Sequence, residues 1–146
     1  MYAIKDANLQ SRVTGMAVDL REDYAAARLV QECVKHFQHI DIIVDNAGAE
    51  HSKDIMEIEL SDLRSVLDLN LHAPFFIVQA VLPYLRKPGR IINISSVAAR
   101  CSPRLLCMLR PKALLEAMTR TMAAAIGEQG HTVNAVEPGL IGSEMV

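Results

Sequence analysis

Short apolar segments rich in β-branched residues alternate with longer amphipathic segments along most of the chain. The short segments predict strands over residues 15–20, 41–45, 90–95 and 132–136. The longer segments have apolar residues at three- and four-residue steps and predict helices over residues 22–37, 60–86 and 113–130. Strands separated by helices pair in parallel through right-handed crossovers. We therefore expect an α/β fold, with a doubly wound parallel sheet and helices on both faces.

The first predicted helix and the strand after it carry specific expectations. Glu22 and Asp23 would occupy the first turn of the helix over 22–37, where acidic side chains suit the helix dipole. The strand over 41–45 is apolar and β-branched in its middle. Such a strand, in a parallel sheet, is expected to be buried on both faces.

The longest predicted helix, over residues 60–86, contains a proline. Ser61 is its expected N-cap. Pro74 has no N–H to give, so the carbonyl four residues earlier, that of Asn70, loses its helical partner. The residues expected on its inner face are Leu63, Val66, Leu67, Phe76, Ala80 and Leu82.

Composition limits the classes of partner and compartment. A length of 146 residues with 51% hydrophobic content predicts one globular domain over residues 1–146. A net charge of -2 without any basic run favours neither nucleic acid nor an anionic membrane. The longest apolar stretch, 73–85, is too short to cross ~30 Å of hydrocarbon. With no secretory signal at the first residues, we expect a cytoplasmic protein. The three cysteines show no metal-ligand spacing, so we expect no disulfide and no bound metal.

Polar and small residues follow every predicted strand. They are Asp19, Asn46 to Gly48, Ser95 with Ser96, and Pro138 with Gly139. Each motif taken alone fits an ordinary turn at least as well as a site. In an open parallel sheet, however, ligands bind outside the carboxyl ends of the strands. Taken together, these residues predict one ligand-binding rim.

The same residues, in this order and spacing, resemble the short-chain dehydrogenase/reductase family over about residues 15–146. The matching positions are Asp45-Asn46-Ala47-Gly48, Asn70, Ile94-Ser95-Ser96, Lys112 and Pro138-Gly139. The resemblance implies a Rossmann-like domain that binds NADP or NAD and transfers hydride between the cofactor and a small carbonyl or alcohol substrate. It also implies a homo-oligomer assembled through long helices. Preference between NADP and NAD cannot be read from these residues.

The resemblance assigns cofactor contacts to individual residues. Asp19 matches the acidic residue that contacts adenine. Asn46 matches the asparagine that meets the nucleotide, while Ala47 and Gly48 let the backbone approach it, glycine because it has no Cβ. Ile141 and Ser143 lie in the segment that covers the nicotinamide amide, where Ser143 replaces the usual threonine.

The resemblance also assigns catalytic roles. Ser96 matches the serine that hydrogen-bonds the substrate oxygen, with Ser95 as the second choice. Lys112 matches the lysine that holds the nicotinamide ribose and lowers the pKa of the family's catalytic tyrosine. Asn70 matches the asparagine whose main-chain carbonyl holds a water near that lysine, which agrees with the carbonyl that Pro74 frees.

Two departures from the family pattern put catalysis in question. Met108 stands four residues before Lys112, where the family has its tyrosine, and a thioether has no proton to donate. Pro111 favours extended geometry at Arg110, which separates Met108 from the helix of Lys112. The composition of residues 100–111 suggests a damaged or misread segment.

The second departure is a missing phosphate-binding turn. No glycine-rich turn precedes the strand at 15–20. The first two strands and the last strand of the family's sheet are therefore expected to be missing, which leaves the sheet edges exposed. Two functions stay open: an oxidoreductase of this family, and an inactive remnant or truncated gene product that acts by associating with a partner.

Overall fold

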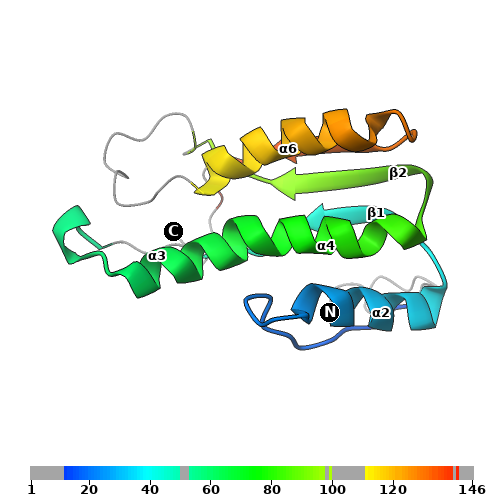
Figure 1. Cartoon of the computed structure of the whole chain (residues 1–146), viewed down its shortest axis with the longest axis horizontal. Coiled ribbons are helices and arrows are strands. Elements are labelled where there is room, and N and C mark those ends of the chain that lie inside the picture. The colour runs from blue at the N-terminus through cyan, green and yellow to red at the C-terminus, as the bar shows by residue number, and fades with distance from the viewer. Residues whose placement is uncertain (1–11, 50–52, 98, 100–110, 140, 142–146) are drawn as a thin grey trace.

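The computed structural model describes residues 12–49, 53–97, 99, 111–139 and 141 (Figure 1). Its helices are α2 (Ala25–Phe37), α3 (Leu60–Leu67), α4 (Ala73–Val81) and α6 (Pro111–Gly127). Its strands are β1 (Ile40–Asp45), β2 (Leu85–Ile94) and β3 (Thr132–Val136). Shorter helical turns are η1 (Ile55–Glu57), η2 (Asp68–His72) and η3 (Leu82–Tyr84).

The three strands form one parallel sheet in the order β1-β2-β3. Val44 lies opposite Ile92, and Ile92 lies opposite Asn134. The parallel pairing predicted for these strands is confirmed. All three therefore end at the same edge of the sheet, where the predicted rim residues begin.

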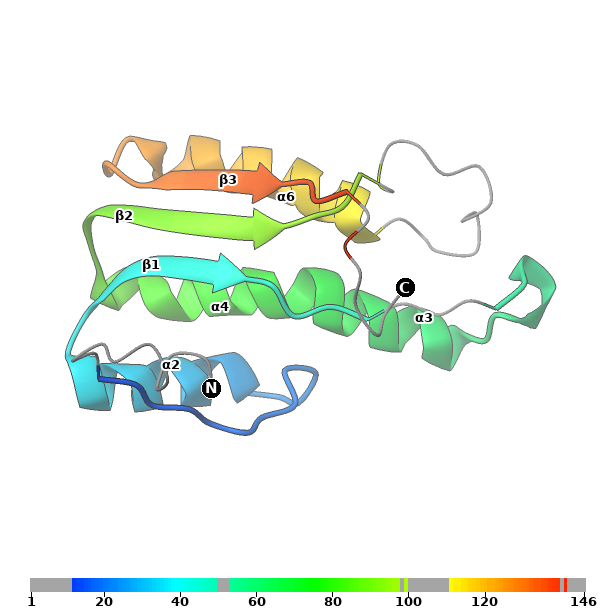
Figure 2. The same cartoon turned by 180° about the vertical axis from the view of Figure 1, so that it is seen from behind.

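The helices lie on one face of the sheet, contrary to the expectation of helices on both. Figure 1 shows them in front of the strands, and Figure 2, from behind, shows the strands in front of the helices. The connections from β1 to β2 and from β2 to β3 advance in the same direction, so crossovers of one hand place their helices on the same side.

The other face of the sheet is open in the described part of the chain. Ile42 and Val44 are 59% and 56% exposed there, so the prediction that this strand is buried on both faces was wrong. The physical reason is that burial of a parallel strand comes from helices on both sides, and here they cover one. An apolar stripe is left on the open face.

The core lies between the sheet and the helices. Its fully buried side chains include Ile91 of β2 and Val81 of α4. The cluster around them contains residues from the helices and from the strands, namely Val30, Ile40, Ile77, Val78, Leu85, Met122, Ile126 and Val133. This packing fixes α6 and α4 against the strands whose ends carry the site.

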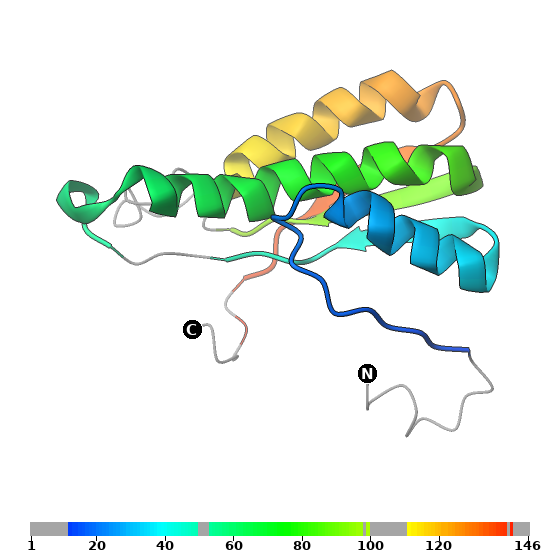
Figure 3. The same cartoon turned by 60° about the horizontal axis from the view of Figure 1, so that its bottom comes forward.

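Residues 15–20 form no strand, which corrects the first predicted strand. The segment over 12–19 runs beside α2 instead of joining the sheet (Figures 2 and 3). Arg12 secures it, because its guanidinium donates to the carbonyl of His36 at 2.8 Å and lies 5.3 Å from the ring centroid of Phe37. A strand needs a hydrogen-bonded neighbour, and no described strand lies next to this segment.

Helix α2 begins at Ala25, three residues later than expected. Tyr24 precedes it in a left-handed conformation, with φ of 62°. Turn hydrogen bonds from the N–H of Glu22 to the carbonyl of Asp19, and from the N–H of Ala25 to the carbonyl of Glu22, hold the preceding residues outside the helix. The two acidic side chains therefore do not lie in its first turn.

The predicted helix over 60–86 is one apolar rod with a distorted middle. Its N-cap is Glu59, whose N–H donates to Asp62 at 3.0 Å, so Ser61 is not the cap. At η2 the helix widens into a π-helical turn, and the N–H of Ala73 reaches back five residues to the carbonyl of Asp68. The widening occurs where Pro74 removes a regular hydrogen bond.

Two further details of this rod differ from expectation. Phe76 is half exposed, not on the inner face, while Val66 is buried as predicted. The last two predicted residues, Leu85 and Arg86, belong to β2, because pairing of Leu85 with Ile40 extends that strand.

The rod over 60–84 also has the length and composition of a membrane span. It has 25 residues, and an 18-residue window within it has a mean hydropathy of 1.4. A core helix passes the same test, and Ile77, Val78 and Val81 are buried against the sheet. We therefore read it as a core helix, in agreement with the sequence.

Candidate functional site

The rim predicted from the sequence is formed by the ends of β2 and β3 together with the loop after β1. Hydrogen bonding between β2 and β3 continues past the strands, from the N–H of Ser95 to the carbonyl of Val136 at 2.7 Å and from the N–H of Val97 to the carbonyl of Pro138 at 3.1 Å. This pairing brings Ser96 and Pro138 to neighbouring strand ends, as the sequence predicted.

Lys112 reaches this rim from the first turn of α6. The helix begins at Pro111, as expected of a proline with no N–H to satisfy. The Lys112 ammonium donates to the carbonyl of Ile94, the last residue of β2, at 2.6 Å. An ammonium has three N–H donors and can bind more than one acceptor.

Asn70 and Gly48 meet beside that ammonium. The Asn70 side chain is buried, and its Nδ2 donates to the carbonyls of Ala49 and Val66, each at 2.9 Å. A Cβ placed on Gly48 would lie 2.8 Å from Asn70 Oδ1 and 3.3 Å from Lys112 Nζ. Glycine is needed here for close approach. Three of the predicted site residues thus converge, and we call Gly48, Asn70 and Lys112 the lysine cluster.

The two serines after β2 have different environments. Ser95 is buried, and its hydroxyl donates to Glu116 Oε1 at 2.7 Å, with the carbonyl of Lys112 at 3.2 Å. Its proton is used inside the protein, which makes it a structural residue. Ser96 is half-buried at the rim, and its contact with a substrate oxygen stays a prediction.

Asp45, the last residue of β1, is a feature that sequence reasoning passed over. It is 7% exposed, and burial raises the pKa of its carboxyl to about 7, against the attraction of the Lys112 charge. Its Oδ2 is buried with no hydrogen-bond partner among the described residues. The signal was available, because the family motif that residues 45–48 resemble is Asn-Asn-Ala-Gly, and Asp45 replaces its first asparagine.

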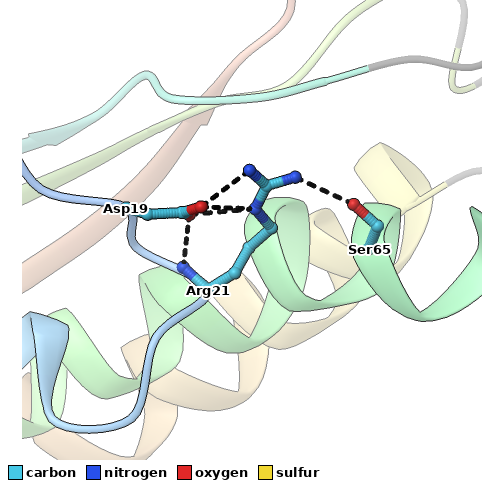
Figure 4. A network of polar contacts seen from close by, with 3 residues as sticks. All are labelled: Asp19, Arg21 and Ser65. Carbon is cyan, nitrogen blue, oxygen red and sulfur yellow. Dashed lines mark hydrogen bonds and ion pairs between the residues drawn. The ribbon is translucent and has the colours of Figure 1, made fainter. Parts of the chain in front are cut away.

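Asp19 is held by its own neighbour (Figure 4). Arg21 donates to its carboxylate from Nε at 2.9 Å and from Nη2 at 2.7 Å, and from Nη1 to the hydroxyl of Ser65 at 3.0 Å. These bonds lower the pKa of Asp19 to about 2. No described contact joins Asp19 to the lysine cluster, and its contact with adenine stays a prediction.

The remaining predicted site residues are either exposed or outside the described part of the chain. Asn46 and Ala47 are exposed in the loop after β1, and Ile141 is exposed as well. Ser143, Met108, Cys101 and Cys107 lie outside the described residues. The roles that the resemblance gave to these positions therefore stay predictions.

Two other features of the described residues bear on ligand binding. Among the described residues, no group of three or more histidine, cysteine or acidic side chains could hold a metal ion. A cavity of about 610 Å³ lies between the start of α2 and the η2–α4 junction, lined in part by Leu20, Ala73 and Phe76. None of the predicted site residues lines it.

The resemblance assigns the lysine cluster to the ribose and nicotinamide end of a dinucleotide cofactor. Gly48 lets Asn70 and Lys112 approach the backbone after β1, because a side chain at this position would meet both of them. Lys112 supplies a cation that can donate to ribose hydroxyls. For the pyrophosphate end, the sequence contains no glycine-rich turn.

Comparisons with known proteins point to one family. A family model described as "Enoyl-(Acyl carrier protein) reductase" matches residues 3–146. The dehydrogenase OXI1 of Cochliobolus heterostrophus is 38% identical over 137 residues, which are 92% of this chain and 59% of that protein. The hydroxynaphthalene reductase-like protein Arp2 of Metarhizium robertsii is 38% identical over 141 residues, covering 95% and 53%.

Solved structures show the same relation. A short-chain dehydrogenase/reductase from Serratia marcescens has a TM-score of 0.91 at 31% identity, covering 99% of this chain and 59% of that one. A complex of Pseudomonas aeruginosa RhlG with NADP has a TM-score of 0.82 at 30% identity, covering 89% and 54%.

A metagenomic blue fluorescent protein in complex with NADPH has a TM-score of 0.83 at 31% identity, covering 88% of this chain and 53% of that one. The chain thus spans little more than half the length of the relatives it matches. Within that span, the fold agrees with solved structures of short-chain dehydrogenase/reductases. The chain belongs to the short-chain dehydrogenase/reductase family.

Proposed function

We propose that this chain contributes to an NADP(H)-dependent oxidoreductase that acts on a small carbonyl or alcohol substrate. The observation that carries the proposal is the convergence of Gly48, Asn70 and Lys112 at the carboxyl ends of β1 and β2. NADP(H) is preferred to NAD(H) because structural relatives are recorded with NADP or NADPH.

Each residue of the rim has a chemical task in this proposal. Lys112 donates to the ribose hydroxyls and keeps positive charge beside the reacting centre. Asn70 holds the loop after β1 in place through its bond to the carbonyl of Ala49. Ser96 donates a hydrogen bond to the substrate oxygen and orients it. When bound, the nicotinamide supplies or accepts the hydride.

A second candidate function is non-catalytic: the chain would bind the cofactor without turnover and would act by associating with a partner. Met108 favours it, because the sequence offers no proton donor at the position that the family gives to tyrosine. Both candidates need the lysine cluster, so binding is tested before turnover.

The test is a titration of the purified protein with NADPH and with NADH, followed by nicotinamide fluorescence and thermal unfolding. We expect saturable binding of NADPH with a rise in Tm. Lys112→Ala should weaken binding about tenfold or more, since it removes a charged donor. Lys35→Ala, which alters an exposed lysine of α2, is the matched control and should leave binding unchanged. A folded protein that binds neither cofactor contradicts the proposal.

Turnover then separates the two candidates. Carbonyl reduction by the unaltered protein supports the oxidoreductase. Binding without reduction, in the protein and in Met108→Tyr alike, supports the non-catalytic function. Activity gained only in Met108→Tyr would show that the missing proton donor is the sole defect.

A further inference from the structure

Asp45 and Asn93 are neighbouring buried residues on adjacent strands, and each carries a side-chain oxygen without a partner. The two residues lie opposite each other in the parallel register of β1 and β2, so their side chains project from the same face of the sheet. Asn93 is fully buried and Asp45 nearly so. Asp45 Oδ2 and Asn93 Oδ1 are the two buried side-chain oxygens without a hydrogen-bond partner in the described part of the chain.

Rotation of the Asn93 amide cannot remove this problem. Asn93 Nδ2 donates to Thr119 Oγ1 at 2.7 Å, and the Thr119 hydroxyl itself donates to the carbonyl of Leu115 at 2.7 Å. The single proton of that hydroxyl is therefore used, and Thr119 can only accept from Asn93. The amide must present its nitrogen to Thr119 and its oxygen elsewhere.

Two neighbouring buried acceptors can both be satisfied if one of them carries a proton and donates it to the other. A protonated carboxyl has an O–H donor, and neighbouring strands are about 4.8 Å apart, within the reach of these two short side chains. We infer that Asp45 and Asn93 share one proton, donated by the Asp45 carboxyl to Asn93 Oδ1, so that Lys112 stands beside a neutral acid while that proton is bound.

The charged groups near β1 agree with a neutral acid. Lys112 of α6 is the charge that acts on Asp45, and burial outweighs it in raising the pKa of the carboxyl. On the same helix, Glu116 accepts from the hydroxyl of Ser95. On η2, Asp68 pairs with His72 at 2.9 Å on the exposed surface.

The shared proton makes Asp45 a positioning residue for the proposed cofactor site, and this part rests on the proposed function. When Asp45 is neutral, it does not compete for the Lys112 ammonium. When it loses the proton, a carboxylate appears beside that ammonium and draws it away from the ribose position. Cofactor affinity should therefore fall as the pH rises through neutrality.

The first experiment needs no cofactor. A carbon-13 NMR titration of the aspartate carboxyls should show one with a midpoint within about one unit of pH 7, absent from Asp45→Asn. Asp41→Asn, which alters an exposed acid of the same strand, is the control and should retain the titration near pH ~7. If every aspartate carboxyl titrates near pH ~4, the inference is wrong. This reading uses the unaltered protein and holds even if Asp45→Asn fails to fold.

Stability supplies the second test. Because the folded protein binds this proton more tightly than the unfolded chain, stability should fall as the pH rises from about 4 to about 7 and then level off. Asp45→Asn supplies a permanent N–H to Asn93, so its stability should not fall over this pH range. The stability of Asp41→Asn should fall as that of the unaltered protein does. Equal profiles for the protein and Asp45→Asn would overturn the inference.

NADPH titrations at several pH values complete the design. Affinity should fall several-fold from pH ~6 to pH ~8 in the protein and in Asp41→Asn, but not in Asp45→Asn. An equal fall in all three proteins would remove the positioning role. An absence of binding at every pH would contradict the proposed function, while the carboxyl titration would still decide where the proton lies.

Discussion

Gly48 shows how a single missing carbon atom shapes the rim. We expect Gly48→Ala to destabilise the protein by about 1–3 kcal/mol, because a Cβ would press on Asn70 Oδ1 at 2.8 Å and on Lys112 Nζ at 3.3 Å. Cofactor binding should weaken with it, since Lys112 must move. Urea unfolding and NADPH titration are the measurements.

Gly127→Ala is the matched control for that substitution. A Cβ on Gly127, at the end of α6, would meet nothing within 4 Å. Alanine is the better helix former, so this variant should be neutral or up to about 1 kcal/mol more stable. Equal losses in the two variants would mean that close approach at Gly48 has no special cost.

At the scale of single residues, the order of the motifs along the chain predicted more of the site than the chemistry of individual side chains did. Gly48, Asn70 and Lys112 were found from their places along the chain, and the structure brings them together. The partners that hold a site residue cannot be read in this way. The bond from Ser95 to Glu116 and the facing of Asp45 and Asn93 depend on packing between segments far apart in the sequence.

Helix α6 offers a comparison of two threonines in the same element. Thr119 is buried and accepts from Asn93, whereas Thr121 is exposed and donates to the carbonyl of Ala117. Thr119→Val should cost about 1–3 kcal/mol, because it leaves the buried Asn93 amide nitrogen without an acceptor.

Thr121→Val should change the free energy of unfolding by no more than about 0.5 kcal/mol, as is usual for exposed positions. Chemical denaturation of both variants gives the comparison. If Thr119→Val proves as stable as Thr121→Val, the Asn93 amide has found another partner, and the argument for its fixed orientation loses its basis.

At the scale of elements, periodicity predicted most helices and strands, and tertiary contacts moved their ends. The strand over 132–136 was predicted correctly to the residue. β2 begins at Leu85 because Ile40 offers it a partner, and the segment over 15–20 stays unpaired because no strand lies beside it. Sequence pattern reports which face of a segment is apolar, but pairing requires a neighbour.

The open face of the sheet should behave as an exposed apolar surface of the whole molecule. Ile42 and Val44 project from it, on the opposite side from Ile43, which packs against the core. We expect the protein to bind the dye ANS, and the pair Ile42→Thr and Val44→Thr to reduce the fluorescence with little change in stability.

Ile43→Thr tests the same strand from its other side. This substitution should lower stability by about 1–3 kcal/mol, because it buries a hydroxyl and removes core contacts. ANS fluorescence that is unaffected by the pair on the open face would show that the face is covered in solution.

The parallel register also has a consequence for the order of folding. β2 is the central strand, yet Arg90 takes its partners from Ile42 and Thr132, both far along the chain in opposite directions. Closing such long loops costs entropy before any strand contact repays it, so the sheet should assemble slowly compared with its helices. During synthesis, β2 can gain its second neighbour only after residues 132–136 have left the ribosome. Until then, β1 and β2 form a two-stranded sheet in which β2 is still an edge strand.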